Sequence, residues 1–336
     1  MGLVAIIALF AIALLWISLT PLKADIESTS PLTFLSVVIC FRDEEASLPR
    51  LLHCIEKASE ASNLVLEFLL IDDHSTDASQ ATIAKANLKN LKCLMNEGNG
   101  KKRALKTGVE AAKFDHILFL DADVHFSDDY FDELQKFVDS KAELTVLPAI
   151  PEGRHYFLDQ FQLLEFLCMS LTSKSFERFR PPMLCNGANL LVQKASWKSV
   201  LKDLHFGLAS GDDIFLLQAL KKRNRRIDSL HNKSLRVYFE VETTWKNFFK
   251  QRIRWGSKAT RYSDYGLLAV GYFMIMTQLA LVLLLIFTLL QKIDVSVVLW
   301  LLIALQVICM TLIRNGLKKH FDVAPHLFAC ILFPVV

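Results

Sequence analysis

The stretch HILFLDAD, residues 116–123, is an apolar run of strand length that ends in two aspartates. Similar short runs lie at residues 35–40, 68–71, 91–95 and 144–147, with helical stretches between them. This alternation is typical of βαβ units, so we predict an α/β fold with a mainly parallel sheet. Polar clusters follow the runs, and the carboxyl ends of parallel strands meet at the edge of a sheet where ligands bind. The sequence therefore predicts a binding crevice lined by these clusters.

Acidic residues follow three of these runs. Glu44 comes after the first run, Asp72 and Asp73 come after the second, and Asp121 and Asp123 come after the fourth. Three acidic strand ends in one crevice would repel one another unless a cation lay among them. Asp121 and Asp123 stand two residues apart, a spacing that points both side chains the same way on a strand. The pair is a candidate site for Mg²⁺ or Mn²⁺, completed by substrate phosphates and water, although Asp-x-Asp is also a common loop sequence.

Two loops are candidates for nucleotide binding: DDHSTD, which begins at Asp72, and NEGNGKK at residues 96–102. Asp77 fits a cap of the following helix. Asp72 and Asp73 instead offer acceptor oxygens to the N–H and O–H groups of a base or ribose. The second loop lacks the Walker pattern GxxxxGK[ST]. Lys101 at a helix start can still hold a diphosphate, and a solvated basic turn explains this loop equally well.

Two further motifs lie in the second half of the chain. Asp212 and Asp213 precede an apolar run at 214–217 that suits a helix, so either is a candidate N-cap. One of them could instead project into the crevice as a general base. The segment QRIRW, residues 251–255, fits an interfacial membrane anchor. It would alternatively stabilise a leaving nucleotide and stack a sugar.

Taken in order, these motifs resemble those of the membrane-integrated family 2 glycosyltransferases. That group contains the cellulose, chitin, hyaluronan and poly-N-acetylglucosamine synthases and ceramide glucosyltransferase. The resemblance covers residues 35–255 and includes NGAN at 186–189, which matches the family's acceptor-side loop. Cys40 stands where the family usually has proline, and Asp43 where it has asparagine. The resemblance implies a GT-A-like fold for the middle of the chain.

The same resemblance implies a role for each motif. Asp213 is implied as the general base, with Asp212 and Arg254 beside it in catalysis. Asp121 and Asp123 are implied to hold the metal, with Asp123 as the direct ligand. The implied donor-binding residues, which contact the base, ribose and diphosphate of a UDP-sugar, are Glu44, Asp72, Asp73, Lys101, Asp121, Gln251 and Trp255.

The implied activity is an inverting transfer of a sugar from a UDP-sugar to a polysaccharide or lipid acceptor. Asp213 would deprotonate an acceptor hydroxyl, which attacks the anomeric carbon opposite UDP, while the metal and Arg254 stabilise the diphosphate. Two alternatives are a transferase that adds a single sugar to a lipid carrier, and a catalytically silent membrane scaffold that binds nucleotide sugar. A glycoside hydrolase also uses paired carboxylates, but it needs neither the lysine loop nor a metal pair.

Three uncharged apolar runs, residues 3–19, 266–290 and 295–313, are predicted to span a membrane. Basic residues follow the first and third runs, which places the middle of the chain in the cytoplasm by the positive-inside rule. A cleaved signal peptide is the alternative for the first run, but nothing basic precedes it. Residues 321–336 are also apolar, and fit either a partial fourth span or the edge of a truncated chain.

These runs divide the chain into an N-terminal anchor at 1–22, a cytoplasmic catalytic domain at 30–262 and C-terminal spans at 264–336. We therefore predict a multi-pass protein of the cell (inner) membrane that contacts membrane lipids. With so few spans, an export channel would need a membrane partner subunit. Residues 156–180 carry apolar side chains at helical spacing, which fits either an amphipathic helix on the membrane or a buried core helix.

Charge and cysteine content exclude other classes. The net charge of +3 comes from mixed signs, which argues against a dedicated nucleic-acid binder. The seven cysteines are odd in number and form no CxxC pair, so neither a disulfide framework nor a zinc site is indicated.

Overall fold

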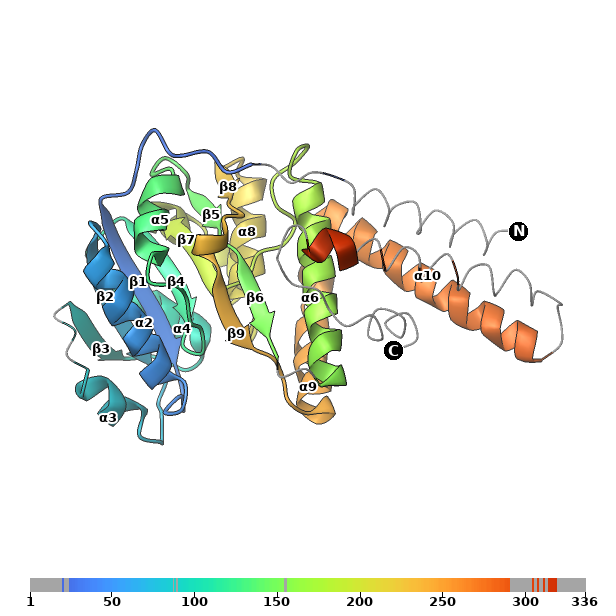
Figure 1. The fold of residues 1–336 in the computed structure, drawn as a ribbon, viewed down its shortest axis with the longest axis horizontal. Helices are drawn as coiled ribbons and strands as arrows, with labels where there is room; N and C mark the ends of the chain where they lie inside the picture. The colour runs from blue at the N-terminus through green and yellow to red at the C-terminus, as the bar shows by residue number, and fades with distance from the viewer. Residues whose placement is uncertain are drawn as a thin grey trace.

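A computed structural model of the chain describes residues 20, 24–86, 88, 90–153, 156–290, 304, 307, 311 and 314–318 (Figure 1). Its centre is a seven-stranded sheet with the strand order β3-β2-β1-β4-β7-β5-β8. The strands are β1 Phe34–Phe41, β2 Val65–Asp72, β3 Leu91–Met95, β4 His116–Asp121, β5 Leu144–Val146, β7 Asn189–Gln193 and β8 Ile227–Ser229.

The sheet is mainly parallel, as predicted. Every pairing in it is parallel except those of β7, which runs antiparallel to both β4 and β5. All five predicted runs are strands, and their ends agree with the prediction to within a few residues. The sequence did not predict β7 or β8.

Helices cover both faces of this sheet (Figure 1). They are α2 Leu48–Ala61, α3 Ser79–Ala84, α4 Lys101–Ala111, α5 Tyr130–Phe137, α7 Lys194–Ser199 and α8 Asp212–Lys222. Strand β1 shows why two layers form: Leu35, Val37 and Ile39 pack with α2 and α5, whereas Val38 packs with α4 and α8 on the other face. A strand buried on both faces is apolar along nearly its whole length, and in this run Ser36 alone interrupts the apolar sequence.

A second, two-stranded sheet lies beside the first. It pairs β6 Ala149–Glu152 with β9 Val237–Glu240 in parallel, and a bridge between His125 and Tyr238 joins it to the end of the β4 loop. Helix α6, Phe157–Ser175, packs against β6. This helix is the one predicted at 156–180. Its first half is buried on most of its sides, which fits a core helix there better than one lying wholly on a membrane.

Helices α9, Trp245–Gly256, and α10, Tyr265–Leu289, follow the second sheet (Figure 1). The predicted span at 266–290 coincides with α10. Within the part of the chain that the structure describes, no helix is long and apolar enough to cross a membrane. The predicted span at 3–19 and the apolar run at 321–336 lie outside the described residues, as does most of 295–313. The spans and the domain boundaries drawn from them therefore stay predictions.

Candidate active site

The loops that follow β1 and β2 are joined by reciprocal hydrogen bonds. Asp43, with a left-handed φ of 55°, accepts from the Thr76 amide at 2.7 Å, and its own amide donates to Ser75 Oγ at 3.0 Å. The Glu44 amide donates to Ser79 Oγ at 2.9 Å, at the start of α3. Asparagine and aspartate tolerate this backbone region better than most residues, which explains the acidic residue at this position. These strand ends meet at one edge of the sheet, as predicted.

Asp72 and Asp73 are both buried and both accept hydrogen bonds from the protein. Asp72 accepts from the Ser75 amide at 2.8 Å and from the Gln80 side-chain amide. Burial alone would raise the pKa of Asp72, but the hydrogen bonds from Gln80 and Ser75 outweigh it and lower the pKa. Asp73 accepts from the Gly100 amide, with its two oxygens at 2.8 and 3.0 Å. Both residues thus shape the loops of the site, and their predicted contacts to a base and ribose stay predictions.

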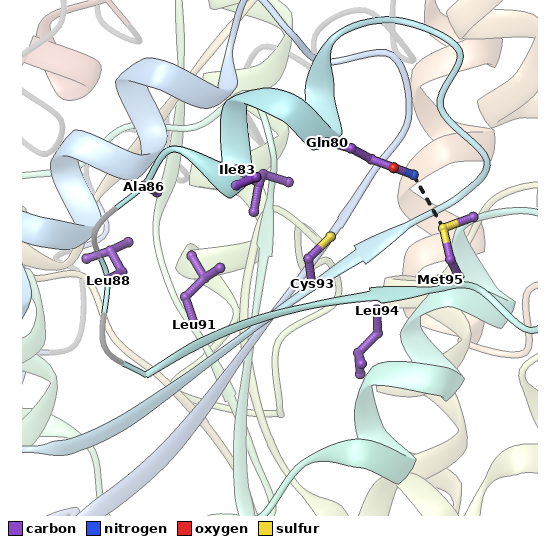
Figure 2. A pocket seen from close by; sticks show the side chains of 9 residues that line it. Gln80, Ile83, Ala86, Leu88, Leu91, Cys93, Leu94 and Met95 are labelled. Atoms are coloured by element: carbon purple, nitrogen blue, oxygen red, sulfur yellow. Dashed lines mark hydrogen bonds between the residues drawn. The ribbon is translucent and has the colours of Figure 1, made fainter.

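An open pocket of about 470 Å³ lies between α3 and the edge strand β3 (Figure 2). Apolar side chains such as Ile83 and Leu91 line it, and Gln80 lies at one end, where its amide nitrogen is 3.4 Å from Met95 Sδ. None of the predicted site residues lines this pocket. We therefore place the candidate chemistry at the strand ends and not in this pocket.

Lys101 connects two of the predicted motifs. It is the first residue of α4, after Gly100, whose φ of 90° suits glycine. Its Nζ lies 2.5 Å from Asp121 Oδ1 and 3.7 Å from Asp212 Oδ2. Burial would lower the pKa of Lys101, but the carboxylates of Asp121 and Asp212 outweigh it and raise the pKa. The structure therefore brings the Asp-x-Asp end of β4 and the start of α8 to one cation.

Three carboxylates crowd the end of β4. Burial and then the charges of Asp121 and Glu44 raise the pKa of Asp123 to about 7. Burial also raises the pKa of Glu44, with a further contribution from Asp121. Among the described residues, no group of three or more His, Cys, Asp or Glu side chains is arranged as a metal site. Asp121 and Asp123 fit a divalent cation by their hard oxygens and by the mutual repulsion that raises the pKa of Asp123 even beside Lys101, with the other ligands left to substrate and water.

Asp212 and Asp213 are the first two residues of α8. Gly211 precedes them with a left-handed φ of 87° and is itself the N-cap, so the expectation that either aspartate caps the helix is wrong. Asp213 Oδ2 accepts from the Gly187 amide at 3.1 Å, and its Oδ1 accepts from the Ile214 amide at 2.7 Å. Burial and then the charge of Asp212 raise the pKa of Asp213. The predicted base thus lies against the predicted acceptor-side loop.

Helix α9 holds the QRIRW segment. Gln251 donates to Glu242 Oε1 at 3.2 Å, and Arg254 is exposed. The ring centre of the partly buried Trp255 lies 4.4 Å from the Arg252 guanidinium carbon. The predicted roles of Gln251, Arg254 and Trp255 in donor binding and catalysis stay predictions.

Arg252 is a residue that the sequence reasoning missed. It ties α9 to α6 through Glu165, with Nε 3.0 and 2.9 Å from the two carboxylate oxygens. Its guanidinium carbon also lies 4.3 Å from the Phe248 ring centre, in addition to its contact with the ring of Trp255. The spacing of Phe248 and Trp255 four residues before and three after Arg252 is the sequence signal that one helix face holds all three.

Comparison with known proteins is consistent with this geometry. The family model for glycosyl transferase family 2 matches residues 36–195, and the model for glycosyl transferase family group 2 matches residues 116–314. A mannosyltransferase from Pyrobaculum calidifontis, solved in complex with GDP-Man and Mn²⁺, superposes with a TM-score of 0.61 over 99% of this chain and 96% of its own. At 14% sequence identity, this likeness shows the shared fold alone.

Two curated relatives share part of the sequence. The undecaprenyl-phosphate 4-deoxy-4-formamido-L-arabinose transferase of Pseudomonas paraeruginosa is 35% identical over 98 residues, which are 28% of this chain and 29% of that protein. The enzyme of the same name from Aeromonas hydrophila is 37% identical over 101 residues, which are 29% of this chain and 31% of that protein. The matched stretch is under a third of each relative's length.

Proposed function

The chain belongs to the family 2 glycosyltransferases, and from that premise we propose that it transfers a sugar, with inversion, from a UDP-sugar to a polysaccharide or lipid acceptor at the membrane. The observation that carries this proposal is the position of Lys101, whose Nζ contacts both Asp121 and Asp212. The residues proposed to hold the donor diphosphate and those proposed to activate the acceptor therefore flank a single cation. A single-step transfer needs both reactants this close together.

Asp213 is the proposed general base. Its carboxylate is held by the Gly187 and Ile214 amides, and burial beside Asp212 raises its pKa. A raised pKa brings a carboxylate closer to the operating pH and makes it a better proton acceptor. In the proposed step, Asp213 takes the proton of an acceptor hydroxyl while that oxygen bonds to the anomeric carbon. The bond between this carbon and the UDP oxygen breaks on the opposite side, which inverts the α-linked donor to a β-linked product.

The leaving diphosphate carries the charge that develops in this step. Lys101 lies at the N-terminus of α4, where backbone N–H groups also favour an anion. The exposed guanidinium of Arg254 is proposed to reach the same group from α9. When bound at Asp121 and Asp123, Mg²⁺ or Mn²⁺ supplies further positive charge to the diphosphate.

A lipid acceptor is favoured by the names of the partial relatives, which act on undecaprenyl phosphate. A phosphate monoester is largely ionised near pH 7, so it attacks without losing a proton to a base. A hydroxyl acceptor, as in a polysaccharide, needs a general base to remove its proton. The two acceptors therefore predict different consequences of removing the carboxylate of Asp213.

A membrane location is supported by the surface of α9. Trp245, Phe249 and Ile253 lie one turn apart on this helix and are 40%, 54% and 73% exposed. Lys246 and Lys250 each follow one of these residues and are also exposed. Adjacent stripes of apolar and cationic side chains suit the surface of an anionic bilayer. We propose that the catalytic domain faces the cytoplasm at the cell membrane, where a membrane partner subunit would complete an export path if the product is a polysaccharide.

The test is release of UDP by the purified full-length protein in detergent. UDP-glucose, UDP-N-acetylglucosamine and UDP-galactose are each supplied with Mg²⁺ or Mn²⁺, beside Asp213→Asn and the control Asp128→Asn, which alters an exposed carboxylate. We expect metal-dependent release from one donor by water or a hydroxyl acceptor, lost in Asp213→Asn and kept in the control. Transfer to a polyprenyl phosphate that survives Asp213→Asn would identify the lipid phosphate as the acceptor. Nucleotide binding without any turnover would instead support the silent scaffold.

A further inference from the structure

Lys258 faces inward immediately after α9. It lies in a tight turn, in which its amide donates to the Trp255 carbonyl at 3.3 Å and its carbonyl accepts from the Arg261 amide at 2.8 Å. The residue is 8% exposed, although Ser257 and Ala259 on either side of it are exposed. Lysine is rarely buried to this extent without a charged partner. We therefore expect the buried ammonium group of Lys258 to have an anionic partner inside the protein.

The stem of Lys258 lies across the residue that precedes the two aspartates of α8. A Cβ placed on Gly211 would come within 2.8 Å of Lys258 Cδ and within 2.8 Å of Phe215 Cε2. Glycine at this position therefore gives room to the lysine stem as well as accommodating its φ of 87°. This contact fixes the methylene chain of Lys258 beside the start of α8, where Asp212 and Asp213 begin the helix.

The charges around this contact are complementary. Burial lowers the pKa of Lys258, and the charges of Asp213 and Asp212 oppose that shift. Burial and Asp212 raise the pKa of Asp213, and Lys258 is the cation that opposes this rise most. The titratable groups around Asp213 are Asp212 on the same helix and, from neighbouring elements, Lys101, Lys102, Cys185, Lys258 and Tyr262.

The other lysines of this group have separate partners. Lys101 contacts Asp121 at 2.5 Å and Asp212 at 3.7 Å. Lys102 donates to the carbonyls of Leu204 and His205 at 2.8 and 2.9 Å. Lys258 is thus the cation that α9 and its following turn contribute to Asp213. The position of this turn is set by the same helix that holds Arg254.

We propose that Lys258 is a positioning residue for Asp213: its ammonium keeps the Asp213 carboxylate ionised and oriented toward the acceptor-side loop at Gly187. This inference rests on the proposed role of Asp213 as general base. Lys258 itself touches neither donor nor acceptor, and acts through the carboxylate. It also explains how a partly buried carboxylate beside a second one stays available to accept a proton.

The test replaces Lys258 with methionine, which keeps an unbranched apolar stem and removes the charge. In the full-length protein, we expect the acid limb of the pH–rate profile for donor hydrolysis to move up by about one pH unit. Activity then falls about tenfold on the acid side and approaches the wild-type value above the limb. Lys258→Arg restores the limb, and Lys222→Met, which removes an exposed cation from α8, leaves it unchanged. A loss that is equal at every pH, or one that arginine does not rescue, overturns the proposal.

A second measurement separates this inference from the proposed activity. Thermal unfolding is compared for wild type, Lys258→Met, Asp213→Asn and the double variant at pH 8 and pH 5. If the two side chains attract each other as ions, the double variant at pH 8 unfolds about 2–4 °C higher than the two single losses predict. The difference is smaller at pH 5 than at pH 8, because the raised pKa of Asp213 makes its carboxylate take up a proton sooner as the pH falls. Additive losses at both pH values refute the role of Lys258, whereas coupling without any donor turnover refutes only the proposed function.

Discussion

Replacing Asp73 with asparagine is expected to open the loop at residues 96–100 even when no nucleotide is present. The Asp73 carboxylate accepts from the Gly100 amide at 2.8 and 3.0 Å and from the Asn96 side-chain amide at 2.6 Å. Asparagine keeps one acceptor oxygen, but its side-chain NH₂ group replaces the second oxygen, which accepts from the Gly100 amide. Two N–H donors then face each other at that position. Hydrogen bonds to a charged group contribute roughly 1.5–3 kcal/mol each, and losses within one network are not additive.

We therefore expect a net loss of about 3 kcal/mol, which is roughly a 150-fold increase in the opening equilibrium of this loop. Hydrogen exchange measured by mass spectrometry on peptides that contain Gly100 reports this equilibrium directly. Asp128→Asn is the matched control, because Asp128 is an exposed aspartate. If hydrogen exchange of the loop is unchanged in Asp73→Asn while UDP binding weakens, then Asp73 acts on the ligand alone. Its hydrogen bonds to Asn96 and Gly100 would then not hold the loop closed.

Three further outcomes follow from other contacts. A Cβ on Gly266 would lie 1.5 Å from Nη1 of Arg180, so Gly266→Ala is expected to displace that guanidinium and lower the thermal unfolding midpoint by several degrees. Gly271→Ala, on the same helix with open space around it, does not lower the midpoint. Arg252→Lys is expected to keep the positive charge but to lose the two-point contact with Glu165 and the contacts with the aromatic rings. We expect this substitution to raise KM for the donor more than it lowers kcat. An effect on kcat alone would contradict this expectation. The pKa of Asp123 is about 7, and a metal binds the ionised carboxylate. The affinity for Mn²⁺, measured by calorimetry, is therefore expected to fall as the pH drops below 7. An affinity that stays constant from pH 8 to 5.5 would exclude Asp123 as a ligand.

The sequence predicted the parallel part of the sheet because its signal is local. Runs such as 117–120 are apolar throughout, and a strand buried between two helix layers has that composition. Strand β7, Asn189–Gln193, is different, since its place is decided by antiparallel pairing with β4 and β5. Those partners lie far away in the sequence, and a five-residue run carries no mark of the strands that it will join. The same reason explains why β8 was missed.

The candidate site was predicted in outline, but the partners of its residues were not. The strand-end rule was enough to bring Asp121 and Asp73 to one edge of the sheet. It could not show that Asp73 accepts hydrogen bonds from the loop at 96–100, because that depends on how the loop folds back. Nor could it show Lys258, which reaches the start of α8 from a turn after α9. Such contacts are made by packing between elements, on which single motifs carry no information.

The aspartates of this site divide into two kinds by the donors and charges around them. Asp72 is as deeply buried as any of them, yet hydrogen bonds from Gln80 and Ser75 lower its pKa, so its charge is already stabilised by the protein. Asp123 and Asp213 each have a second carboxylate beside them, and burial together with that neighbouring charge raises their pKa values. A carboxylate of the first kind gains little from a proton or a cation, because its charge has partners. One of the second kind gains from either, which is the property that metal binding and proton abstraction require. The environment, more than the residue type, therefore separates the carboxylates that build the site from those proposed to do its chemistry.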